Sequence, residues 1–187
     1  MNQLELFKQE VEATGIFKCA WTDIEKVVFD PIFREMCVQN SCGLYGKCYM
    51  CPPDVGDIHE MIAEAKTYNK GLLYQTVASI EDSFDFEGMT EAKRAHNAVA
   101  QQIHKIIQRV LPEANCLHMA AGGCGVCARC AKLDHLPCYF PEKALPSLES
   151  YGVDVYHTAE NAGLRYVNGS NTVTYFGMVL MRENENA

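Results

Sequence analysis

Four cysteines between residues 122 and 141, the second cysteine loop, have a spacing that suits an iron–sulfur cluster. Cys124, Cys127 and Cys130 follow one another at intervals of three residues, and Cys138 comes shortly before a proline. A C-x2-C-x2-C run places three thiolates on one winding of backbone, where each can hold a different iron of a 4Fe–4S cubane. Zinc suits this run less well, because structural zinc sites usually take two cysteines from one knuckle and two ligands from elsewhere.

A second group of four cysteines lies earlier, in residues 35–56, the first cysteine loop. Its apolar residues follow neither a helical nor a strand period, so we expect an ordered loop. Thiolates this close would repel one another and oxidise unless a cation held them, which predicts a metal site. A zinc knuckle stays open as an alternative here. The eight predicted ligands of the one or two clusters are Cys37, Cys42, Cys48, Cys51, Cys124, Cys127, Cys130 and Cys138.

The other two cysteines, Cys19 and Cys116, have no cysteine at ligand spacing. We expect both to be small buried core residues, since a free cysteine commonly packs as a hydrophobe.

Length and charge limit the class of protein. The 187 residues, of which 48% are hydrophobic, fit one domain over 1–187 that needs no disulfides to fold. The N-terminal segment does not resemble a signal peptide, and no apolar run is long enough for a membrane span. We therefore expect a cytoplasmic protein, where clustered cysteines indicate metal more often than disulfides. The net charge of −8 argues against nucleic acid as a partner.

The pattern of the chain predicts an α/β fold. Helices are expected over 4–13, after Asp57, over 89–111 and over 155–161, and strands over 24–29, 71–80, 116–121 and 172–181. His96 and His104 lie on the long helix and are expected to be solvated. We predict a single domain with a mixed sheet flanked by helices, from one end of which the two cysteine-rich metal-binding loops emerge and share a space.

Two sets of motifs resemble a known family. The first runs from Cys42–Gly43–Leu44–Tyr45–Gly46 to Cys51–Pro52–Pro53, and the second from Gly123–Cys124 through Cys138 to residues 147–155, SLESYGVDV. Together they are similar to a bacterial and archaeal family of unknown function described as predicted metal-binding proteins. The resemblance spans residues 34–161 and implies metal binding and a presence in anaerobes. Cys48 has no counterpart among the family's cysteines.

These patterns predict an iron–sulfur protein that transfers electrons to a redox partner protein. The alternatives are a zinc-stabilised interaction module and an iron–sulfur enzyme whose cluster has one open iron. No nucleophile elbow, P-loop, dinucleotide fingerprint or zinc-protease helix is present in the sequence, so no catalytic residue is assigned.

Overall fold

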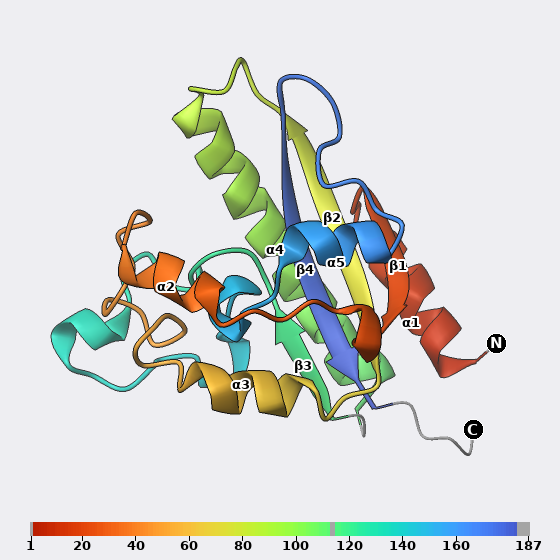
Figure 1. Ribbon diagram of the computed structural model, residues 1–187, viewed down its shortest axis with the longest axis horizontal. Helices are drawn as coiled ribbons and strands as arrows, with labels where there is room; N and C mark the ends of the chain where they lie inside the picture. The colour runs from red at the N-terminus through yellow and green to blue at the C-terminus, as the bar shows by residue number, and fades with distance from the viewer. Residues whose placement is uncertain (1, 113–114, 183–187) are drawn as a thin grey trace.

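A four-stranded sheet forms the middle of the protein in this computed structural model, which describes residues 2–112 and 115–182 (Figure 1). Its strands are β1 (Lys18–Asp23), β2 (Lys70–Ser79), β3 (Cys116–Met119) and β4 (Thr172–Met181), in the order β1-β2-β4-β3. All three ladders are antiparallel. β3 runs in the same direction as β2, but β4 lies between them, so no parallel ladder forms.

The predicted α/β class, with a single sheet flanked by helices, is confirmed, and the sheet differs in being antiparallel instead of mixed. A parallel contact does occur beyond the end of β3, as an isolated bridge between Ala120 and Ser147.

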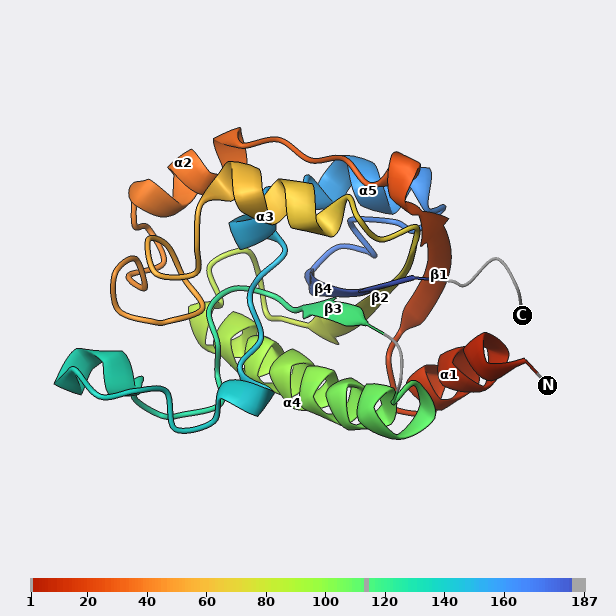
Figure 2. The ribbon, with the colours of Figure 1, turned by 90° about the horizontal axis from the view of Figure 1, so that it is seen from below.

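Helices cover both faces of the sheet. α1 (Gln3–Glu12) and α4 (Phe86–Val110) lie on one face, and α2 (Ile32–Val38), α3 (Ile58–Ala65) and α5 (Val155–Asn161) lie on the other (Figure 2). No helix among the described residues combines the length and the apolar character needed to cross a membrane. The result is a three-layer arrangement in which the sheet is buried on both sides.

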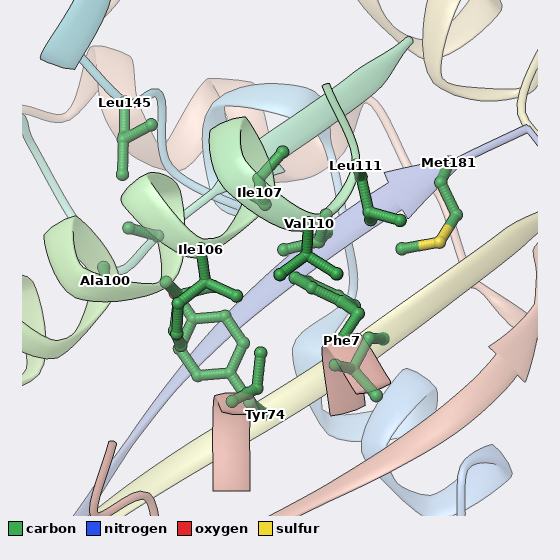
Figure 3. Packing of buried hydrophobic residues seen from close by; sticks show 14 residues of the cluster. Phe7, Tyr74, Ala100, Ile106, Ile107, Val110, Leu111, Leu145 and Met181 are labelled. Carbon is green, nitrogen blue, oxygen red and sulfur yellow. The ribbon is translucent and has the colours of Figure 1, made fainter. Parts of the chain in front are cut away.

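Successive side chains along each strand point to opposite faces of the sheet, so the strands contribute to a hydrophobic core on each face. Leu72 and Tyr74 of β2 pack toward α1 and α4, whereas Leu73 between them packs into the core on the opposite face. Figure 3 shows the first of these cores, where Phe7 of α1 and Val110 of α4 meet the sheet. Cys19 and Cys116, which were expected to be buried in the core, are only partly buried and pack against the edge of this cluster.

Local signals placed most elements well. Asn2 and Glu5 form the predicted capping box of α1, and Asp57 caps α3 by accepting from the backbone N–H groups of His59 and Glu60. The strand expected over 24–29 is wrong. The chain pairs with β2 over Lys18–Asp23 instead, and Ile24–Lys26 forms a 3₁₀ turn.

The two histidines expected to be solvated are not. His96 is fully buried, with its Nδ1 atom 2.9 Å from Thr76 Oγ1, and burial lowers its pKa to about 4. His104 is half-buried, and its Nε2–H donates to the carbonyl of Glu142 at 2.8 Å. The buried face of α4 is therefore wider than the stripe of apolar residues in its sequence, because it includes these two histidines.

Candidate metal centre

Both cysteine loops lie beyond the β3 edge of the sheet, on the side of the molecule away from β1 (Figures 1 and 2). They touch at several points. Tyr49 donates its hydroxyl to the carbonyl of Leu136 at 2.8 Å, and Lys132 forms a salt bridge with Asp54. The expectation that the loops share one space is confirmed by these contacts.

The two loops also pack against each other at Gly123. A Cβ atom at this position would overlap Leu44 Cδ1 and would lie 3.1 Å from Cys51 Sγ. A residue with a side chain would therefore push the first loop away. In the sequence, the Gly122–Gly123 pair indicated that the backbone approaches another group closely. The spacing of the cysteines could not show that this group is Leu44 and Cys51.

Five cysteine side chains line one cavity between the loops. Its volume is about 380 Å³, part of which is open to solvent. Of the eight predicted ligands, the structure brings these five around the cavity: Cys48, Cys124, Cys127, Cys130 and Cys138. Cys48 is the one contributed by the first loop, so the four-plus-four division of the sequence becomes five around this cavity and three elsewhere.

Cys48 occupies a central position between the two loops. Its side chain is only 3% exposed and is hydrogen-bonded to the side chains of Cys51 and Cys130. The bond from the Cys51 thiol, together with those from the backbone N–H groups of Met50 and Cys124, lowers the pKa of Cys48 to about 6. The pKa of Cys51 is raised, because its proton is held by the Cys48 thiolate and its sulfur is buried. Cys48 and Cys51 therefore titrate as a pair that shares one proton.

Cys124 is positioned by the backbone around it. The N–H groups of Val126 and Leu145 donate to its sulfur, while burial, the larger effect, raises the pKa of its thiol. Leu145 follows a 3₁₀ turn, Pro141–Lys143, whose carbonyls at Glu142 and Lys143 accept from α4 side chains. Helix α4 thus fixes the exit of the second loop, a role that residue types alone do not indicate.

The remaining three predicted ligands form a separate group. Cys37 lies on helix α2, not in the loop that the sequence predicts, whereas Cys42 is exposed and Cys51 is buried. The charges of Cys37 and Cys42 are among the smaller causes that raise the pKa of Cys51. Periodicity missed α2 because none of its residues is buried.

Arg34 anchors α2 beside this group. Its Nη1 and Nη2 atoms donate to the carbonyls of Gly56 and Ser150, each at 2.7 Å. Burial lowers the pKa of the guanidinium, and the neighbouring Cys37 opposes that effect.

The donor set fits a metal that prefers sulfur, since thiolates select zinc and iron–sulfur clusters. Among residues 2–112 and 115–182, no three His, Cys, Asp or Glu side chains lie close enough together to hold one metal ion. The cysteines instead line the wall of the cavity from two sides.

A family model described as predicted metal-binding protein (DUF2284) matches residues 20–181. The chain therefore belongs to this family, whose function is unknown. The match covers both cysteine loops and confirms the resemblance seen in the sequence. No curated protein and no solved structure matches the chain.

Proposed function

We propose that this protein binds iron–sulfur clusters of the 4Fe–4S type at its two cysteine loops and transfers electrons to a partner protein. The observation that carries the proposal is the cavity lined by five cysteines from both loops. A cubane distributes its thiolate ligands over separate irons, so ligands spread around a cavity suit it better than they suit one ion.

Cys124, Cys127, Cys130 and Cys138 would hold the cluster of the second loop. The backbone N–H groups that donate to Cys124 sulfur support this assignment, because hydrogen bonds to cluster sulfurs stabilise the more negative, reduced state. When bound, the cluster supplies a one-electron carrier. The chain itself fixes the loop exit through His104 and limits access of water by packing the first loop over Gly123.

Cys37, Cys42 and Cys51 would hold a second cluster. Their shared electrostatic environment and the anchoring of α2 by Arg34 support a common site. The contacts across Gly123 bring the two loops together, and nearby centres exchange electrons more readily than distant ones. This arrangement favours a relay over catalysis.

Exposed apolar side chains near the second loop support docking of a partner. Leu133 and Leu136 are 40% and 44% exposed, and Tyr139 and Phe140, which also line the cavity, are 56% and 40% exposed. Apolar groups gathered on one part of a surface commonly mark an interaction site, and transient redox complexes need only a small one.

The metal and sulfide content of protein purified without oxygen tests this function. We expect a brown protein that contains iron and inorganic sulfide in equal amounts, with visible absorbance that bleaches on reduction. A colourless protein with stoichiometric zinc and no sulfide would replace the electron carrier with the zinc-stabilised interaction module.

A further inference from the structure

Four polar side chains on one side of α4 run along the second cysteine loop. They are four, four and three residues apart, which places them on a single stripe of the helix: Lys93, Asn97, Gln101 and His104. The last two hold the exit of the loop, because they donate to the carbonyls of Lys143 and Glu142 at 2.9 and 2.8 Å. The first two lie against the start of the loop. The stripe therefore contacts the loop at both of its ends.

Lys93 lies against Gly122, two residues before Cys124. Gly122 has a φ of +63°, and a Cβ atom built on it would lie 2.6 Å from Lys93 Nζ. One turn further along α4, Asn97 lies against Gly125, where a Cβ atom would be 2.8 Å from Asn97 Nδ2. These contacts fall on both sides of Cys124 in the chain. Because two residues of extended chain span at most about 7 Å, the Lys93 ammonium lies close to the start of the C-x2-C-x2-C run.

The charge of Lys93 has no partner among the residues that the structure describes. Its side chain is half-buried, and no other described residue forms a hydrogen bond or an ion pair with it. The cations of the second loop itself differ, since Arg129 and Lys132 each form a salt bridge with an aspartate and Lys143 lies over a phenyl ring. Charges taken partly out of water are normally paired, so an anionic group beside Gly122 would complete this site.

A 4Fe–4S cluster bound by four thiolates is such an anionic group. One-electron reduction of its core from [4Fe–4S]²⁺ to [4Fe–4S]⁺ adds a further negative charge. A fixed positive charge nearby therefore stabilises the reduced state more than the oxidised state. Net charge is one of the factors that set the reduction potentials of such clusters.

We propose that the Lys93 ammonium raises the reduction potential of the second-loop cluster by compensating the negative charge of its thiolates. The absence of side chains at Gly122 and Gly125 lets α4 approach the loop closely enough for this. The inference rests on the proposed function, because it assigns a role to a residue that does not bind the metal itself.

The test compares Lys93→Met with Lys105→Met. Methionine keeps the unbranched stem of the lysine and removes its charge, and Lys105 is an exposed lysine about three turns further along the same helix. Potentials are measured by titration with dithionite, followed by electron paramagnetic resonance (EPR) of the reduced cluster. The second-loop centre is identified as the signal that Cys127→Ser removes.

We expect Lys93→Met to disfavour the reduced cluster about tenfold, a fall of about 59 mV for a one-electron couple. This is the order of size expected for unit charges about 10 Å apart at an effective dielectric constant of about 20. Lys105→Met should stay close to the native potential. An unchanged potential in Lys93→Met, or equal shifts in both variants, would overturn the inference.

A Lys93→Arg variant separates charge from packing. It keeps the positive charge, so we expect its potential to stay close to that of the native protein. Loss of iron in Lys93→Met that Lys93→Arg does not share would support the electrostatic role. Loss of iron in both variants, with unchanged circular dichroism, would show that the lysine acts by packing alone and would contradict the proposal.

The two proposals fail in different ways. Zinc without sulfide in the native protein would remove the proposed function, and the role of Lys93 with it. An intact iron–sulfur centre whose potential does not depend on residue 93 would remove the role of Lys93 alone.

Discussion

The two groups of cysteines differ in how they are built. Around the second loop, Cys124, Cys127 and Cys130 come from one short winding and face a cavity that the first loop closes with Cys48. In the first loop, Cys37 comes from a helix, Cys42 is exposed and Cys51 is buried next to Gly123. This difference shows that the spacing of cysteines along the chain brings the second-loop group together. The positions of the first-loop cysteines depend instead on how α2 and the loop pack.

The largest expected effect breaks the second-loop group directly. Cys127→Ser should remove the cluster of that loop, which is about four irons per protein, because one iron loses its thiolate and the winding loses its brace. The first-loop centre should keep its own iron. Iron and sulfide analysis of the anaerobic variant measures this, and full iron content would contradict the ligand assignment.

A smaller but still large effect is expected where the two groups meet. Gly123→Ala should separate the loops, since the new methyl group overlaps Leu44 and crowds Cys51. Overpacking of this kind costs about 1–3 kcal/mol. Urea denaturation and iron content should both show the loss. A second change, Leu44→Ala, removes the overlapping atom and should restore both properties in the double variant. If Gly123→Ala had no effect alone, the loops would not be in the contact described.

Titration of the Cys48–Cys51 pair tests whether Cys48, which lines the second-loop cavity, is also paired with a first-loop cysteine. In metal-free, reduced protein, ultraviolet thiolate absorbance should rise as pH passes through about 6, since hydrogen bonds stabilise the Cys48 thiolate. Cys51→Ala removes the strongest of those bonds and should move the transition to higher pH. Cys116, whose pKa burial raises to about 11, should stay protonated in this range. An identical titration in the Cys51 variant would exclude the pairing.

The smallest effect is expected at the cysteines outside both groups. Cys19→Ser and Cys116→Ser should leave the metal content unchanged and cost about 1 kcal/mol of stability, as is typical of changes at the edge of a core. Denaturation and iron analysis of the same samples check both statements. Loss of iron in either variant would show that the division into ligands and core residues is wrong.

Local sequence signals were sufficient to predict the helices and strands whose bounds depend on their own residues. The strand predicted over 172–181 and the helix predicted over 155–161 match β4 and α5 residue for residue, because apolar content and an Asp154 cap are local properties. The strand over 24–29 was wrong because β1 is an edge strand, set by pairing with β2. Sequence patterns contain little information about such pairing.

The candidate site divides in the same way. Spacing was enough to single out the eight cysteines and the second loop. It could not indicate that Cys48 faces the other loop or that Cys37 is on a helix, since both depend on how segments far apart in the chain pack together.

Quantitation of iron together with EPR of the fully reduced protein tests the two-centre account most directly. We expect about eight irons per protein and two magnetically coupled 4Fe–4S centres, because the contact across Gly123 brings the loops together. Replacing Cys37, Cys42 and Cys51 together should halve the iron and abolish the coupling. About four irons in the native protein, unchanged by that replacement, would leave one cluster in the second loop and contradict the relay.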